Sequence, residues 1–254
     1  MLFRGLQALG FGVLTGALLA LMAWQSPARN AVNEEALIFN AENADLFGEY
    51  PYIESTLSLQ TLAVDEGGRY AFVYVDGVRL QVRAAEQLLP PCVRLSELFA
   101  DAVLIDNCGS YALLSLADAA VGNNEINVRP SSDAEIGVGS PAIIDLRQNP
   151  AVVALLGDYR HRLYTRPLSL RGRIKLEVQT DVTGGRRYYL AVGEDKVLFN
   201  LLALQAGDRV KAVNGVALSA VEALTDIYAD LSERNQLALT LERDGRDRVL
   251  LLRY

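Results

Sequence analysis

The chain has 254 residues, of which 51% are apolar and 22% charged, so it has room for one to three domains and is too apolar for a disordered protein. Two cysteines and one histidine exclude zinc sites of the finger, ribbon or HExxH type. Residues 1–148 hold eight arginines, no lysine and 18 acidic residues (net −10), whereas residues 149–254 hold 16 basic and 13 acidic residues (net +3). The acidic first part argues against nucleic acid as a partner.

A run of residues without a charge, Gly5–Trp24, opens the chain. As a helix rising about 1.5 Å per residue, it matches a bilayer core of about 30 Å. The run exceeds the apolar region of a signal peptide, which is about 7–15 residues long. Residues 1–24 are therefore predicted to be a cytoplasmic tip and a transmembrane helix that stays on the protein. The alternative is a signal peptide cleaved near Ser26–Ala28.

Small residues recur every four positions along this predicted helix, at Ala8, Gly12, Gly16 and Ala20. Such a seam lets a second membrane helix approach closely and predicts association within the membrane. The alternative is that Gly and Ala are simply common in membrane helices. Arg4 and the terminal amine precede the run, which favours a cytoplasmic N-terminus.

Four further parts follow along the chain. Residues 25–54 are predicted to be an acidic linker, and residues 55–118 a small all-β domain of six short strands with turn signals between them. Residues 119–148 hold Gly, Asn, Ser and Pro clusters and are predicted to be a second linker. Residues 149–254 are predicted to be an α+β domain with an N-terminal helix, Ala151–Leu163.

The two cysteines flank two predicted strands, Val93–Leu98 and Ala102–Asp106, which are joined by a turn centred on Ala100. This register places Arg94 opposite Asp106, a sensible cross-strand pair, and Cys92 opposite Cys108. Directly opposed strand residues have Cα atoms about 4.5–5.5 Å apart, within disulfide range. We therefore expect a Cys92–Cys108 disulfide; the alternative is two free thiols.

The C-terminal part, Tyr189–Tyr254, resembles a bacterial PDZ domain. The resemblance is carried by Leu204–Gly215, with the sequence LQAGDRVKAVNG and a predicted strand at Arg209–Val213, followed by a helix and a terminal hairpin. The resemblance implies a ligand groove between the strand Tyr189–Val192 and that helix. The groove candidates are Tyr189, Leu190, Val192, Leu224 and Tyr228.

This PDZ-like sequence lacks one feature of peptide-binding PDZ domains. Their Gly-Leu-Gly-Phe-like loop holds a C-terminal carboxylate with backbone N–H groups. The matching stretch here, Arg187–Leu190, has no glycine at its centre, which restricts the turn that aims those groups. Internal strands or folded surfaces are therefore the expected ligands.

The layout of the chain resembles the type II secretion system inner-membrane protein C family, also called general secretion pathway protein C. That layout is one membrane span, a linker, a small β homology region, a second linker and a PDZ domain. Within Leu57–Leu116, the segments Ala71–Gly77 and Phe99–Ile105 resemble the homology region. Leu156–Arg160 and Pro167–Leu170 resemble the lead-in to the PDZ domain.

The resemblance implies a single-pass protein of the bacterial inner membrane with a periplasmic bulk and no cofactor. Its implied partners are the outer-membrane secretin, the inner-membrane platform proteins of the system, the folded proteins being exported, and further copies of itself. In that family the homology region contacts the secretin, and the PDZ domain helps to choose exported proteins. The secretin-binding candidates lie in the first hairpin: Thr61, Tyr70, Tyr74 and Arg79.

Two other function classes compete with this interpretation. A membrane-anchored PDZ adaptor that regulates a periplasmic protease or chaperone would account for the C-terminal part but leave the β domain without a role. An enzyme would need a nucleophile and a base. A Ser-His-Asp triad would have to use His161, the single histidine, and no GxSxG motif, P-loop or GxGxxG motif is present. The sequence therefore favours a non-enzymatic protein.

Overall fold

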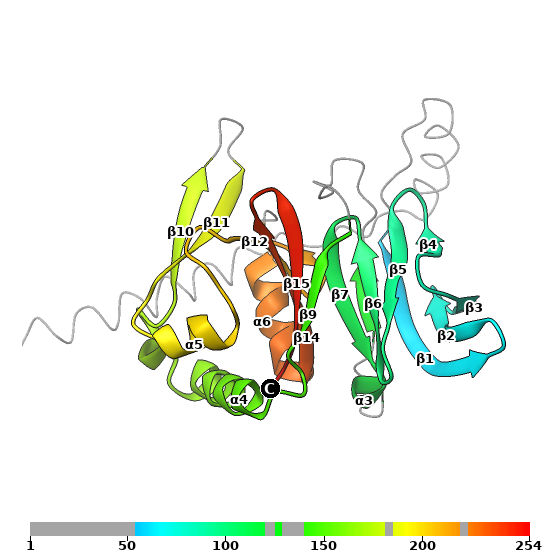
Figure 1. Cartoon of the computed structure of the whole chain (residues 1–254), viewed down its shortest axis with the longest axis horizontal. Coiled ribbons are helices and arrows are strands. Elements are labelled where there is room, and N and C mark those ends of the chain that lie inside the picture. Colours follow the sequence, from blue (N-terminus) through cyan, green and yellow to red (C-terminus); the bar gives the residue numbers. More distant parts are fainter. Residues whose placement is uncertain (1–53, 120–124, 129–139, 181–184, 219–222) are drawn as a thin grey trace, which may run out of the picture. The chain divides into compact units, whose positions relative to one another are not determined.

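The computed structural model describes residues 54–119, 125–128, 140–180, 185–218 and 223–254 (Figure 1). The expected transmembrane helix, its seam of Ala8, Gly12, Gly16 and Ala20, and the acidic linker up to Ile53 lie outside these residues. Within the described ranges, no helix is long and apolar enough to cross a membrane.

Two four-stranded sheets form the first domain (Figure 1). One sheet has the order β3-β2-β1-β8, with β1 at Ser55–Asp65, β2 at Gly68–Val75, β3 at Val78–Val82 and β8 at Glu125–Val128. The other has the order β4-β5-β6-β7, with β4 at Gln87–Leu89, β5 at Val93–Leu98, β6 at Ala102–Asn107 and β7 at Ser110–Ser115. A short helix, α3 (Leu116–Ala119), follows β7. The two sheets share one apolar core, which includes Leu57, Leu59, Val73, Leu95, Ile105 and Leu114.

All six strands expected in this domain are present, and the structure adds two more. Strand β4 was not among the six predicted strands. Strand β8 lies inside the predicted second linker, residues 119–148, and pairs with β1. Its Ile126 and Val128 are buried while Glu125 and Asn127 are exposed, so it is a half-buried strand too short to stand out among turn residues.

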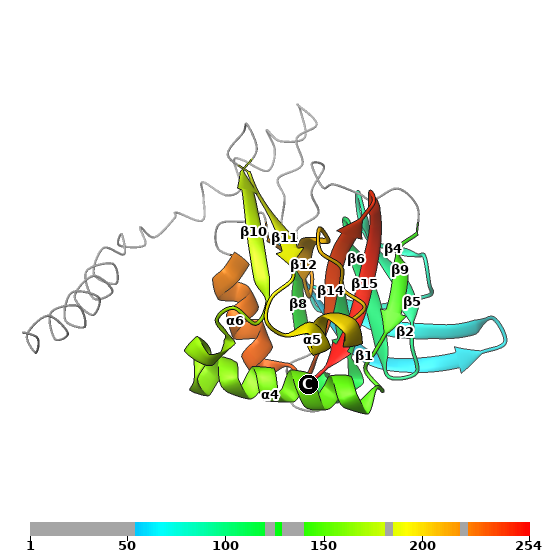
Figure 2. The same ribbon diagram turned by 60° about the vertical axis from the view of Figure 1, so that its left-hand side comes forward.

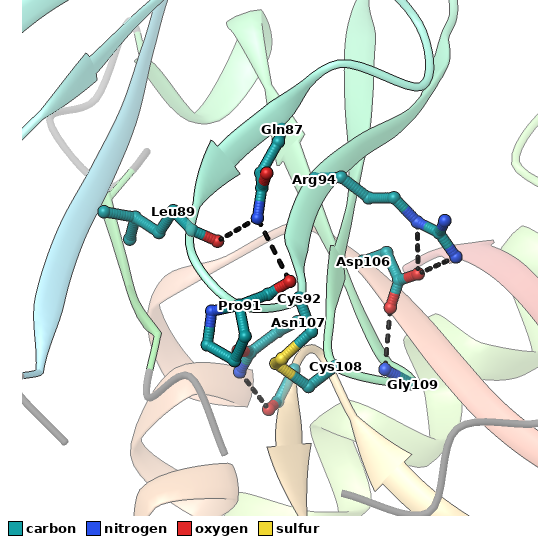
Figure 3. The surroundings of a disulfide bond; sticks show 10 residues. Gln87, Leu89, Pro91, Cys92, Arg94, Asp106, Asn107, Cys108 and Gly109 are labelled. Carbon is teal, nitrogen blue, oxygen red and sulfur yellow. Dashed lines mark hydrogen bonds and ion pairs between the residues drawn. A yellow bond between two sulfur atoms is a disulfide. The ribbon is translucent and has the colours of Figure 1, made fainter. Parts of the chain in front are cut away.

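The predicted disulfide between Cys92 and Cys108 is present, with Cα atoms 5.0 Å apart (Figure 3). The predicted pair of Arg94 and Asp106 is also present. The turn is not centred on Ala100, however, because β5 and β6 shift register by one residue between Leu95 and Glu97. This bulge restores the predicted register on the side of the cysteines.

The second domain is built on a sheet with the order β10-β11-β12-β14-β15-β9 (Figures 1 and 2). Its strands are β9 at Ala142–Asp145, β10 at Lys175–Thr180, β11 at Arg186–Ala191, β12 at Arg209–Val213, β14 at Gln236–Arg243 and β15 at Arg246–Arg253, and β13 at Val216–Ala217 pairs with β12. The helices are α4 at Pro150–Thr165, the 3-10 turn η1 at Pro167–Leu170, α5 at Lys196–Leu201 and α6 at Ala223–Glu233.

Helices α4, α5 and α6 pack on this sheet around one apolar core, giving the PDZ-like domain that the sequence indicated. The core includes Val152, Leu190, Leu198, Ile227, Leu241 and Leu250. Asn149 caps α4 by accepting the N–H groups of Ala151 and Val152, and Pro150 begins the helix. Strands β9 and β10 were not predicted, and β9 pairs in parallel with β15 from within the expected second linker.

We predict that removal of the disulfide destabilises the first domain. The bridge closes a sequence separation of 16 residues, so its loss costs about 3 kcal/mol in the chain-entropy model. The Cys92→Ala, Cys108→Ala double variant should show this loss in urea unfolding followed by circular dichroism. Reductant should destabilise the natural chain by a similar amount and leave the variant unchanged. Two alkylatable thiols in the non-reduced natural chain would contradict the prediction.

Candidate functional site: an aromatic face on the first sheet

Three aromatic side chains line the outer face of strand β2. Tyr70, Phe72 and Tyr74 are half-buried, whereas the residues between them, Ala71 and Val73, are fully buried in the core. This alternation of two is what a strand with one solvated face requires. The sheet thus presents an aromatic row outward, a residue type that is enriched at protein interfaces.

Two arginines lie over these rings. The Arg79 guanidinium is 3.7 Å from the centroid of the Phe72 ring, and the Arg83 guanidinium is 5.7 Å from the centroid of the Tyr70 ring. The Tyr70 and Phe72 rings meet edge to face, with centroids 5.4 Å apart. Contacts of this kind restrict the conformations of the arginines and the rings. We call Tyr70, Phe72, Tyr74, Arg79 and Arg83 the aromatic face.

An ion pair fixes one end of the aromatic face. Arg83 Nη2 lies 2.7 Å from Asp65 Oδ2, at the turn end of β1. The hydrogen bond from Arg83 holds the pKa of the Asp65 carboxyl below its usual value, and the same bond raises the pKa of Arg83. Arg79, at the other end, is exposed and leaves its charge open to a partner.

The structure brings the four secretin-binding candidates together. Tyr74 pairs directly with Arg79 across β2 and β3, and Thr61 pairs with Phe72 across β1 and β2 after a register shift at Gln60. Directly opposed residues share a face of the sheet. Phe72, the residue at the centre, was missed by the sequence reasoning, although its place between Tyr70 and Tyr74 in the alternating pattern could have identified it.

The expected PDZ groove is arranged differently from the sequence prediction. Strand β11 pairs with β12 at Tyr188 and Tyr189, and with β10 along its whole length, from Arg186 to Ala191. The edge of β11 at which a ligand strand was expected to add is therefore already filled by β10. Direct addition of a ligand strand to β11 requires β10 to leave.

The groove candidates do not line one open channel. Leu190 is buried in the domain core, Tyr189 is half-buried and Val192 is exposed. Tyr228 packs against Tyr164 of α4 with its ring tilted by 55°, and the ring centroids are 4.9 Å apart. Leu224 lies on α6, and its side chain is outside the described part of the structure. The structure thus scatters these residues between the core and the surface.

The turn in the PDZ-like signature is held by one buried carboxylate. Asp208 Oδ2 accepts the Gln205 N–H at 2.8 Å and Arg243 Nη2 at 2.7 Å, and Asp208 Oδ1 accepts Arg243 Nε at 2.6 Å. The Asp208 side chain has no exposed surface. The Gly207-Asp208 pair therefore ties the turn before β12 to β14, which is a structural role.

No protein-family model matches the sequence. Type II secretion system protein C of Vibrio cholerae serotype O1 is 31% identical over 67 residues, which are 26% of this chain and 22% of that protein. The match thus spans about a fifth of the relative's length. It confirms the resemblance to type II secretion system protein C that the sequence indicated.

Two solved structures of the PDZ domain of EpsC from Vibrio cholerae are also similar. One is 24% identical, with a TM-score of 0.34, and covers 41% of this chain and 99% of its own. The other is 27% identical, with a TM-score of 0.30, and covers 34% of this chain and 98% of its own.

We predict that replacing Asp208 destabilises the PDZ-like domain. Asp208→Ala leaves the Gln205 N–H and the Arg243 guanidinium without their acceptor and should cost about 2–4 kcal/mol. Asp208→Asn keeps one acceptor oxygen and should cost less. Thermal unfolding of the three chains measures the order, and equal midpoints for all three would show that the carboxylate does not hold this turn.

We also predict that β10 keeps ligand strands away from β11. Leu190 exchanges backbone hydrogen bonds with Gly207 and Asp208, so the N–H groups of Tyr189 and Ala191 point toward β10. These two amides should exchange slowly with solvent in the free protein. Proline at Glu177, which faces Tyr189, removes a ladder hydrogen bond and should accelerate both by at least ten-fold.

Val178→Pro is the matched control for this prediction. The N–H of Val178 faces away from β11, at the free edge of the sheet, where proline is tolerated. It should leave the Tyr189 and Ala191 amides protected. Only the Glu177→Pro chain should then bind a labelled extended peptide at β11, which NMR chemical-shift changes at the Tyr189 and Ala191 amides would report. Tight peptide binding by the natural chain at β11 would show that its edge is open.

Proposed function

We propose that this chain is a non-enzymatic component of the type II secretion machinery that works by binding other proteins. The similarity to type II secretion system protein C supports the assignment to this machinery. In this proposal the chain is an inner-membrane protein that links the membrane platform to the outer-membrane secretin. Its PDZ-like domain helps to select the folded proteins that are exported.

The aromatic face is the observation that carries the binding role. Tyrosine, phenylalanine and arginine are enriched at protein interfaces, and tyrosine and arginine are also enriched among the residues that supply most of the binding energy. Here the rings are held by their own contacts, so little conformational entropy is lost when a partner covers them. We assign this face to the periplasmic N-terminal domain of the secretin.

A catalytic role finds less support. A Ser-His-Asp triad would have to use His161, which lies exposed on α4 between Arg160 and Arg162. The carboxylates of Asp208 and Asp65 pair with arginines, and they serve a turn and the end of a hairpin. The side chains of the aromatic face suit recognition and offer no nucleophile with an adjacent base.

We predict that Phe72→Ala weakens binding to the secretin N-terminal domain at least ten-fold, or about 1.4 kcal/mol, because Phe72 is the central ring and the support of Arg79. Arg79→Lys keeps the charge but loses the planar stacking, so its effect should be smaller. Isothermal titration calorimetry with the full chain in detergent measures both.

Val64→Ala is the matched control. Val64 is a 71% exposed aliphatic residue of the same hairpin. Its neighbour Ala63 faces Tyr70 across the strands, so Val64 lies on the opposite face of the sheet. It should leave the affinity unchanged. Circular dichroism shows that each variant is folded. Equal affinities of the Phe72→Ala, Val64→Ala and natural chains would remove the aromatic face from the interface.

A further inference from the structure

Strands β6 and β7 are apolar on both faces. Val103, Ile105 and Leu114 point into the core of the first domain. The alternate residues Leu104 and Leu113 point to the other face, and they are fully buried as well. A strand with one solvated face would alternate apolar and polar residues. The outer face of β6 and β7 is therefore built to be covered.

The PDZ-like domain covers this face with a matching strip. Ala238 of β14 and Val249 and Leu251 of β15 point away from the core of their own domain. They form one buried cluster with residues of β6 and β7, which we call the interdomain cluster: Ala102, Leu104, Tyr111, Leu113, Ala238, Val249 and Leu251. All seven have at most 4% of their surface exposed.

Side chains of the PDZ-like domain also satisfy the backbone of β7 at its open edge. The Tyr111 N–H donates to Thr240 Oγ1 at 3.0 Å, and the Leu113 N–H donates to Asn214 Oδ1 at 2.9 Å. These N–H groups, two residues apart, are the ones an added strand would use. Single side chains occupy them, and none of the described strands of the PDZ-like domain pairs with β7.

Polar contacts at the ends of the interface align the two domains. Arg147, just after β9, lies 3.0 Å from Asp101 Oδ1 and stacks over the Phe99 ring at 4.8 Å, both in the β5–β6 turn. Gln236 Nε2 donates to Ser115 Oγ at 3.1 Å. Asn107, next to the disulfide, donates from Nδ2 to the Gly215 carbonyl at 3.4 Å.

We propose that the PDZ-like domain is an intramolecular partner of the first domain and closes the β7 edge to strands of other proteins. A strand from outside reaches that edge only after the PDZ-like domain has moved away. The aromatic face lies on the other sheet, on β2 and β3, and its side chains are half-buried to exposed with the interface closed. A partner can therefore bind the aromatic face while the β7 edge stays covered.

Two glycines allow a matched test of this proposal in the full chain. Gly215 (φ 85°) follows Asn214 (φ 46°), and Gly245 (φ 72°) follows Asp244 (φ 52°), so alanine strains the backbone in both turns. A Cβ at Gly215 would meet the Cβ of Ala112 in β7 at 2.9 Å, whereas a Cβ at Gly245 meets nothing within 4 Å. Only Gly215→Ala therefore pushes the domains apart.

Amide hydrogen exchange measures the result. The natural chain is compared with the Gly215→Ala and Gly245→Ala variants. We expect the Tyr111 and Leu113 amides to exchange slowly in the natural chain and in Gly245→Ala. Gly215→Ala should accelerate both at least ten-fold and should bind an apolar fluorescent dye at the uncovered cluster. Protection at Val73 and Leu250, within the two separate domains, should remain, which shows that neither domain has unfolded.

Thr240→Val gives a second, independent arm. Valine keeps the shape of threonine but removes the hydroxyl that accepts the Tyr111 N–H, so exchange should accelerate more at Tyr111 than at Leu113. The proposal is overturned if Tyr111 and Leu113 exchange in the natural chain as fast as an uncovered edge strand. It is also overturned if Gly215→Ala and Gly245→Ala behave alike while both domains remain folded.

Discussion

The burial of β6 and β7 on both faces is the constraint on which the rest of the described structure depends. One face completes the core of the first domain, and the other meets β14 and β15. Each domain on its own would leave an apolar strip of Leu104 and Leu113, or of Val249 and Leu251, in contact with water. Burying such surface is favourable by about 25 cal/mol per Å² of apolar area, and small domains have little core of their own to offset its exposure.

Charged side chains lie at one end of this interface and align the two domains. Arg147 is buried between Asp145, at 2.7 Å, and Asp101, at 3.0 Å. Burial raises the pKa of the Asp145 carboxyl, but the hydrogen bonds from Arg147 more than offset this, so its pKa lies below the usual value. Asp118 accepts the Asn235 N–H with one carboxylate oxygen, and its other oxygen has no partner among the described atoms. Burial raises the pKa of this carboxyl. The apolar cluster supplies the attraction, and the ionic contacts mainly set the alignment.

Particular elements show what the sequence could predict. Strand β12 was predicted to the residue, because Arg209–Val213 ends at an Asn-Gly turn, and the disulfide followed from a hairpin register. Thr61 faces Phe72 only because β1 contains a bulge, and no local sequence pattern predicts a bulge. Strand β10 is exposed at every residue, so it lacks the buried alternate positions by which strands are recognised. Strands β8 and β9 are short and owe their conformation to distant partners, β1 and β15.

The backbone edges of two strands, β11 and β7, are covered in different ways. In the PDZ-like domain, β11 is the strand at which ligand strands were expected, and it is paired with β10 on one side and with β12 on the other. The outer strand is β10, whose Leu176 and Val178 are 52% and 53% exposed. In the first domain the β7 edge is closed by Thr240 and Asn214. Backbone pairing recognises almost any strand, whereas a side-chain surface such as the aromatic face selects by shape and charge. Because the β11 and β7 edges are covered, we infer that the aromatic face, with its packed rings and exposed arginine, selects its partner by side-chain shape and charge.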